Sequence, residues 1–261
     1  MKVEIRRVDG NEMDFLLSDS NPAFANSLRR SIMREIPTMA VDEADFYSND
    51  SALYDEIIAH RLAMIPLTTP PGYKLPEECT CTDKRCPKCS VSFKVKVKGP
   101  YLLTSADLKG SDPKVRPVSD KIPIVKLEEK QELEFEAIAR LGFGKVHAKW
   151  QPALCSYKYM PVVTIHPRAC NGCGDCVEVC PKKILRVEGD KVRVSEVELC
   201  IMCKACQRAC KRGAIEVGWD DTKFLFHLES TGTMPPQEIL EKGLEALKEK
   251  FEDFISAVKK L

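Results

Sequence analysis

The sequence predicts an α+β protein with more than one domain, and three observations support this prediction. Much of the chain alternates apolar and polar residues with the period of two that is typical of half-buried strands. Residues 22–36 and 240–258 instead repeat apolar residues every three or four positions, as amphipathic helices do. The 13 cysteines gather mainly in two segments, which indicates small cofactor-binding modules within a chain of 261 residues.

The composition excludes several classes of protein. A hydrophobic fraction of 44% is ordinary for a globular chain, so disorder is not expected. The 40 basic and 39 acidic residues give a net charge of +1, which offers no electrostatic basis for nonspecific binding to nucleic acid or to a membrane. No apolar run approaches the roughly 20 residues that span a bilayer, and the N-terminus has no signal-peptide core. We therefore expect a cytoplasmic protein whose cysteines are reduced and available to metals.

The N-terminal elements are predicted from turn residues and periodicity. The first 17 residues predict two short strands around a hairpin turn at Gly10-Asn11. A helix over residues 22–36 follows, and its apolar face consists of Phe24, Leu28, Ile32 and Ile36. The strand expected at residues 38–47 slips by one position at Asp42-Glu43, which predicts a β-bulge.

The middle of the chain predicts one helix among several strands. Residues 51–64 are expected to be helical, with a buried set made of Leu53, Ile57, Ile58 and Leu62. Alternation predicts further strands at residues 91–97, 122–127, 133–141, 156–165 and 223–229. Pro-rich and Asp-rich stretches between them are expected to be loops.

The last helix carries a long apolar stripe. Its members are spaced by four and three residues in alternation, which makes a seam along one face: Leu240, Leu244, Leu247, Phe251, Phe254 and Val258. Such a stripe needs a partner surface. Either it packs on the sheet of its own domain, or it also packs on another subunit, and the periodicity supports both interpretations equally.

Two matching runs of cysteines form an internal repeat, the cysteine repeat (residues 170–210). Both runs follow the spacing C-x2-C-x2-C-x3-C, and the second begins 30 residues after the first, at 200 against 170. Three thiolates on a tight loop can ligate three corners of a cubane iron–sulfur cluster, while the fourth points away and ligates the other cluster. The repeat is therefore predicted to be ferredoxin-like and to hold two [4Fe–4S] clusters.

The crossed fourth cysteines define the expected ligand sets. One cluster is assigned to Cys170, Cys173, Cys176 and Cys210, and the other to Cys200, Cys203, Cys206 and Cys180. Gly172 and Gly174 would let backbone amides approach the cluster sulfurs. Zinc on CxxC pairs is the alternative, which the duplicated runs of four disfavour. One departure is Lys211, which stands where a proline is expected after the last cysteine.

A smaller group of cysteines forms the four-cysteine loop (residues 79–89). Its members are Cys79, Cys81, Cys86 and Cys89. Structural zinc is bound by four tetrahedral ligands on closely spaced loops, so this loop is a candidate zinc site. Free or disulfide-linked thiols are the alternative. Cys155, in an apolar strand, is predicted to be a core residue, and His60 and His147 are predicted to have structural, hydrogen-bonded roles.

Three stretches resemble a known family. They are NPAFANSLRRSIMREIPTMAV at residues 21–41, LYDEIIAHRLAMIPL at residues 53–67 and LGFGKVHAKWQP at residues 141–152. Together they closely resemble the D subunit of archaeal RNA polymerase, the counterpart of the third-largest subunit of eukaryotic RNA polymerase II and of the bacterial α N-terminal domain. Some members of this family carry a ferredoxin-like insert, and members with all eight cysteines look like those of methanogens such as Methanosarcina.

The resemblance implies a discontinuous fold. An α-like dimerisation domain would comprise residues 1–42, 151–165 and 220–261. A mixed β domain would be inserted at residues 43–150, where the eukaryotic counterpart has a similar zinc loop. A ferredoxin-like [4Fe–4S] domain would be inserted at residues 166–219.

The resemblance also implies a function. The chain would be a noncatalytic assembly subunit that pairs with the small subunit L to form the platform for the two large catalytic subunits, and subunits N and P would join the same platform. It would meet nucleic acid only indirectly through the complex, and it would not bind a membrane. Arg29 and Arg30 of the first helix are expected to contact a large subunit, the alternative being that they are solvated charges.

The sequence contains no catalytic motif of its own. A Gly-rich phosphate loop, a nucleophile elbow and a carboxylate-rich metal triad are all missing from it. The aspartates needed for two-metal nucleotidyl transfer would therefore belong to other subunits. A ferredoxin-like electron-transfer protein is the alternative function. In an assembly subunit the clusters would instead serve folding or sensing, because metal ligation contributes folding free energy.

Overall fold

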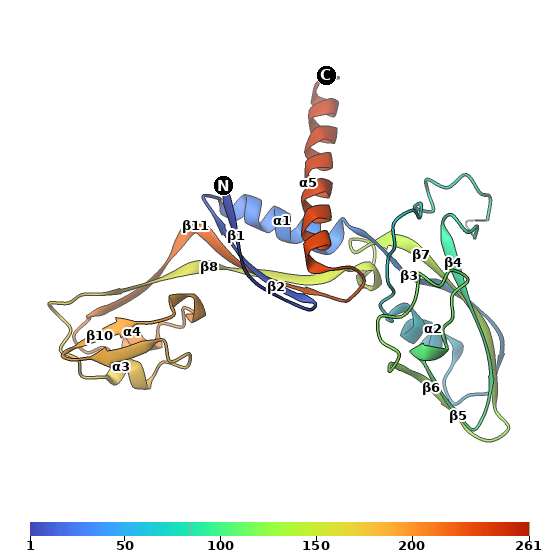
Figure 1. Cartoon of the computed structure of the whole chain (residues 1–261), viewed down its shortest axis with the longest axis horizontal. Helices are drawn as coiled ribbons and strands as arrows, with labels where there is room; N and C mark the ends of the chain where they lie inside the picture. The colour runs from blue at the N-terminus through green and yellow to red at the C-terminus, as the bar shows by residue number, and fades with distance from the viewer. Residues whose placement is uncertain (84, 261) are drawn as a thin grey trace. The chain divides into compact units, whose positions relative to one another are not determined.

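The computed structural model describes residues 1–83 and 85–260, and its fold is mixed α/β with strands in the majority (Figure 1). This agrees with the predicted α+β class. The chain divides into two compact units, each built from several segments. Unit 1 comprises Met1–Arg7, Asp14–Asn26 and Ser156–His227, and unit 2 comprises Val8–Met13, Ser27–Cys155 and Leu228–Leu261.

A four-stranded sheet has the strand order β1-β2-β11-β8. Its strands are β1 (Lys2–Asp9), β2 (Glu12–Ser18), β8 (Ala153–Ile165) and β11 (Ile215–Ser230). The predicted hairpin is confirmed, and Gly10 at its turn has a φ of 56°, which a glycine adopts without strain. β11 begins well before the predicted strand at residues 223–229, because Ile215 and Val217 already alternate inward and are buried.

Aromatic rings pack together on this sheet within unit 1. Phe15 of β2 stacks on Phe226 of β11, with ring centroids 4.7 Å apart and 6° between the ring planes. Tyr157 of β8 contacts Phe226 at 5.2 Å and Phe224 at 5.6 Å. Large buried rings contribute strongly to the hydrophobic stabilisation of a small unit.

The cysteine repeat folds as two similar halves. In the first half α3 (Asp175–Glu178) precedes β9 (Leu185–Glu188), and in the second α4 (Ala205–Ala209) precedes β11. β10 (Lys191–Val194) pairs antiparallel with β9, and the 3-10 turn η3 (Val197–Leu199) leads into the second run of cysteines. Both halves contribute apolar side chains to one small core: Ile184, Leu185, Val192, Ile215 and Val217.

Unit 2 contains an antiparallel sheet in the order β3-β7-β4. Its strands are β3 (Pro37–Asn49), β4 (Ser90–Lys98) and β7 (Glu132–Phe143), while β5 (Tyr101–Thr104) and β6 (Pro123–Leu127) form a second pair. Two short 3-10 turns, η1 (Ser105–Asp107) and η2 (Ala148–Trp150), connect the strands. The predicted bulge is confirmed, because the pairing of β3 with β7 shifts register between Val41 and Glu43. The short strand β5 was not predicted.

Helix α2 (Asp55–Ala63) is shorter than the helix predicted over residues 51–64. The side chain of Asn49 holds the preceding residues in a loop, because its Nδ2 donates to the Leu53 carbonyl at 2.9 Å and its Oδ1 accepts from the Ser51 amide at 3.0 Å. Such local side-chain hydrogen bonds compete with the helical ones.

The burial predicted for this helix is partly wrong. Ile58 and Leu62 are fully buried, and Leu53 packs on the core from the preceding loop. Ile57 is 46% exposed. It lies about 100° around the helix from Ile58, so it turns away from the sheet.

Helix α1 (Pro22–Arg34) ends earlier than the predicted residue 36. A residue before proline avoids the helical conformation, so Pro37 restricts Ile36. The predicted apolar face is otherwise confirmed: Leu28, Ile32 and Ile36 are buried, and Phe24 is half-buried.

Helix α5 (Pro236–Val258) crosses α1 closely at Gly243. The Ser31 hydroxyl donates to the Gly243 carbonyl at 2.6 Å. A Cβ atom on Gly243 would lie only 2.7 Å from Cγ1 of Ile32, so this approach requires glycine.

Among the residues that the structure describes, no helix is long and apolar enough to cross a membrane.

The predicted stripe of α5 is divided between two environments. The buried residues of the helix are Pro236, Ile239 and Gly243, which lie beside the stripe and not on it. The stripe residues Leu240 and Leu247 are half-buried, whereas the others are 42% to 67% exposed: Leu244, Phe251, Phe254 and Val258. Most of the stripe is therefore left uncovered by the described chain.

Gly243→Leu is expected to lower the free energy of unfolding by about 1–3 kcal/mol, because the new side chain must displace Ile32 from a close-packed contact. Ala246→Leu, at a half-buried position of the same helix, is the control and should remain near the parent. Guanidinium unfolding followed by circular dichroism measures both. An equal loss in the two variants would contradict the close crossing.

Candidate metal and iron–sulfur sites

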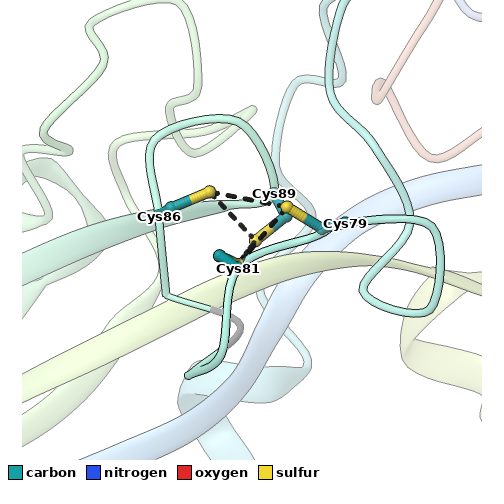
Figure 2. A group of neighbouring side chains, drawn as sticks. All are labelled: Cys79, Cys81, Cys86 and Cys89. Atoms are coloured by element: carbon teal, nitrogen blue, oxygen red, sulfur yellow. Dashed lines mark hydrogen bonds between the residues drawn. The ribbon is translucent and has the colours of Figure 1, made fainter.

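The four-cysteine loop brings its thiols to one point (Figure 2). The Sγ atoms of Cys79, Cys81, Cys86 and Cys89 all lie within 4.8 Å of one another. Four of the six pairs lie 3.3 to 3.7 Å apart, with Cys79 and Cys81 the closest and Cys86 and Cys89 the most distant of the four. A tetrahedral zinc with Zn–S bonds of about 2.3 Å holds its sulfurs roughly 3.8 Å apart. The separations also exceed the roughly 2.05 Å of a disulfide bond, so no disulfide joins these cysteines.

Hydrogen bonds hold this loop in shape. The Cys89 amide donates to the Cys86 carbonyl at 3.0 Å, which closes a tight turn and brings both thiols to the same side. Arg85 joins the loop to β3 by donating to Glu43 at 2.8 Å and to Asp45 at 2.7 Å. These hydrogen bonds and ion pairs help to hold the thiols close together.

The thiols of the loop differ in acidity. Burial raises the pKa of Cys89 to about 12, and the hydrogen bond with Cys79 lowers the pKa of Cys81 to about 6. One thiolate is therefore available near neutral pH, while the buried thiol needs a cation beside it to ionise. Because metals bind thiolates and release their protons, this donor set fits a divalent cation.

A charge network next to the β3 bulge supports the same loop. Arg140 of β7, whose side chain is 7% exposed, donates to Glu43 at 2.6 and 3.2 Å. Lys149 donates to Asp42 at 2.8 Å. The bulge turns both carboxylates towards these cations, and a buried guanidinium without a partner would be strongly destabilising. The Arg140 hydrogen bonds also lower the pKa of Glu43.

The eight cysteines of the repeat line two hollows within unit 1. Hollow A is lined by Cys170, Cys173, Cys176 and Cys210, and hollow B by Cys180, Cys200, Cys203 and Cys206. Each hollow takes three cysteines from one run and the fourth from the other, the same groupings as the expected ligand sets. Burial raises the pKa of Cys176 and of Cys206, so these thiols would ionise only beside a positive centre such as a metal. Four cysteines in a largely apolar hollow suit a [4Fe–4S] cluster.

The two halves of the repeat have the same backbone conformation at matching positions, although the residues at these positions differ. Gly172 and Gly174 have φ values of 69° and 87°. Their counterparts in the second half, Met202 and Lys204, have φ values of 54° and 58°. A side chain in this left-handed region costs roughly 1–2 kcal/mol. Gly172 and Gly174 adopt this conformation without strain, whereas the strained residues of the second half were not predicted although the 30-residue offset points to them.

Two backbone amides approach cysteine sulfurs of the repeat. The Met202 amide donates to Sγ of Cys200 at 3.4 Å, and the Ala214 amide donates to Sγ of Cys210 at 3.3 Å. Hydrogen bonds of this kind tune the electron density on a ligating sulfur. They act at one cysteine of each hollow.

The other residues singled out in the sequence differ in their surroundings, and His60 is exposed. Cys155 is buried, which raises its pKa to about 12, as befits the predicted core thiol. His147 Nδ1 accepts from the backbone amide two residues later at 3.0 Å and caps η2. Arg30 is exposed, whereas Arg29 is half-buried with its Nη1 3.6 Å from Sδ of Met33.

Two family models match the regions just described. Residues 41–165 match the RNA polymerase Rpb3/RpoA insert domain, and residues 162–211 match a 4Fe-4S dicluster domain. Together they define an RNA polymerase subunit of the Rpb3/RpoA class that carries an iron–sulfur domain.

Curated relatives narrow this class to one family. DNA-directed RNA polymerase subunit Rpo3 of Archaeoglobus fulgidus is 42% identical over 262 residues, covering 100% of this chain and 98% of the relative. Subunit Rpo3 of Methanosphaera stadtmanae is 39% identical (99% and 98% covered), and that of Methanosarcina acetivorans is 38% identical (100% and 99% covered). The chain belongs to the Rpo3 family of archaeal DNA-directed RNA polymerase, and the resemblance noted in the sequence is confirmed.

The Arg140–Glu43 pair is expected to make stability depend on pH. Because the pKa of Glu43 is lowered in the folded state, the pair contributes fully above the ordinary carboxyl pKa of 4.5 and loses its contribution as the pH falls through the lower folded value. Glu43→Gln should be less stable than the parent near neutral pH, and the difference should shrink below about pH 4.

Urea unfolding at a series of pH values measures this difference. Glu249→Gln, at an exposed position of α5, is the control and should match the parent throughout. A Glu43→Gln deficit that stays constant from neutral to acidic pH would contradict the role given to the pair.

Proposed function

We propose that the chain is a noncatalytic assembly subunit of cytoplasmic DNA-dependent RNA polymerase. It pairs with the small subunit L, and the pair gives the two large catalytic subunits a platform that subunits N and P also join. Similarity over the full chain to proteins named Rpo3 supports this proposal. The net charge of +1 suits a subunit that meets nucleic acid only through the complex.

The uncovered face of α5 carries this proposal. Leu244, Phe251, Phe254 and Ile255 are each between 42% and 67% exposed. Gathered apolar side chains of this size mark interaction surfaces, and the alternating spacing of the stripe suits packing against another helix. Subunit L, with a dimerisation fold of the same kind, is the proposed occupant.

Two arginines of α1 are a second proposed contact. Arg30 is exposed and Arg29 is half-buried, so the helix presents positive charge beside its buried face. We propose that these arginines meet a large subunit. Guanidinium groups are enriched at protein interfaces because they form several directed hydrogen bonds.

The proposed domains follow the path of the chain. Residues 1–42, 151–165 and 220–261 form the dimerisation domain, residues 43–150 the inserted β domain, and residues 166–219 the iron–sulfur domain. The neighbouring positions of β8 and β11 in one sheet support an insertion between these strands, since such an insertion leaves the sheet intact. The proposed boundary after residue 219 lies within β11.

The proposed cofactors are two [4Fe–4S] clusters and one zinc ion. Hollows A and B would each hold a cluster, and the four-cysteine loop would hold the zinc. When bound, these groups supply folding free energy, because the unfolded chain has no preformed site. A structural or regulatory role for the clusters is therefore proposed, in preference to electron delivery.

Cys89→Ser is expected to remove zinc from the purified chain while leaving its iron content unchanged, because the two donor sets share no residue. Cys155→Ser, which changes a thiol outside both sets, is the control and should retain both metals. Elemental analysis by mass spectrometry measures them. Zinc retained in Cys89→Ser, or missing from the parent, would contradict the proposed zinc site.

Phe254→Glu is expected to weaken pairing with subunit L by roughly thirtyfold, since loss of one buried aromatic anchor costs about 2 kcal/mol. Ser256→Glu introduces the same charge on the far side of the helix and should pair normally. Anaerobic co-purification and titration with subunit L measure the effect. Equal pairing of both variants would contradict the proposed interface, and a parent chain that is free of polymerase and reduces an oxidoreductase would support the electron carrier instead.

A further inference from the structure

Hollows A and B differ in the charges that surround them. Hollow B is lined by Lys182 and Lys204, and none of its described lining residues is acidic. Hollow A is lined by Lys211 and Arg212 but also by Asp175. Hollow B therefore has the more positive surroundings.

A third lysine, from strand β8, donates a hydrogen bond to a residue that lines hollow B. Lys158 of β8 is half-buried, and its Nζ donates to the carbonyl of Glu198 at 2.6 Å and to that of the lining residue Cys200 at 3.1 Å. The carboxylate of Glu198 is paired with Arg6 of β1 at 2.9 Å. The ammonium is thus fixed beside a cysteine of hollow B. Arg6, which also pairs with Glu4, offsets part of the negative charge of Glu198.

The backbone at Lys204 points in the same direction. This residue has a φ of 58°, whereas the matching position beside hollow A is Gly174. Glycine would adopt this conformation without the strain that lysine carries there. A positive charge that acts on the contents of hollow B would explain why a lysine occupies this strained position.

We propose that hollow B holds the more easily reduced of two clusters, and that Lys158 is a positioning residue that holds Cys200 and raises the reduction potential of that cluster. This inference rests on the proposed presence of a cluster in each hollow. Reduction adds one electron from an external reductant and neither forms nor breaks a bond. A fixed cation stabilises the reduced cluster, which carries one more negative charge than the oxidised cluster. Net charge and hydrogen bonding are among the factors that set cluster potentials.

The test is a dithionite titration of the full-length chain, purified anaerobically and followed by electron paramagnetic resonance. The parent should show two reduction steps. Lys158→Met should shift the higher step to lower potential and leave the lower step in place, and Lys158→Arg should restore it. Arg212→Met, the matched change beside hollow A, should move only the lower step.

Lys204→Gly tests the charge at a second position beside hollow B. It should lower the same higher step while raising resistance to unfolding, because it removes both a charge and a strained residue. This variant decides the matter if Lys158→Met fails to load hollow B. With full iron and sulfide content, unmoved steps in both variants, or movement of the lower step alone, would overturn the inference. A parent without iron and sulfide would overturn the proposed cofactors themselves.

Discussion

The pairing of β8 with β11 is the constraint on which the iron–sulfur segment depends. β8 ends at Ile165 and β11 begins at Ile215, and the two strands are neighbours in one sheet. The His166 amide donates to the Ala214 carbonyl at 2.9 Å and extends this pairing to the base of the repeat. Because the two ends of the iron–sulfur segment are held side by side, Cys170 and Cys210 both line hollow A although they come from opposite ends of this segment.

The four-cysteine loop is positioned by a different kind of interaction. Its two ends do not lie on adjacent strands, and charge pairing takes the place of strand pairing. Arg85 from the loop and Arg140 from β7 converge on Glu43, which the bulge in β3 presents to both. One irregular position in a strand therefore supplies the anchor for a site more than 30 residues away in sequence, at 79–89.

The features that could be predicted from the sequence are those with a local period or spacing. Alternation located most strands, the slip at Asp42-Glu43 located the bulge, and cysteine spacing gave the groupings found around both hollows. The missed features depend on residues far apart in sequence. Lys158 bonds to a loop about 40 residues later, and Gly243 matters through the side chain it lacks, which a search for apolar residues cannot detect.

The crossed composition of the hollows limits how this segment can change during evolution. A duplicated module can usually lose one copy and keep the other working. Here, removal of the second run would leave three cysteines at hollow A and one at hollow B, and removal of the first would do the reverse. A descendant can therefore lose a single site only through point substitutions that leave the backbone of both halves in place. Among related chains, the length of the cysteine repeat should therefore vary less than the number of its cysteines.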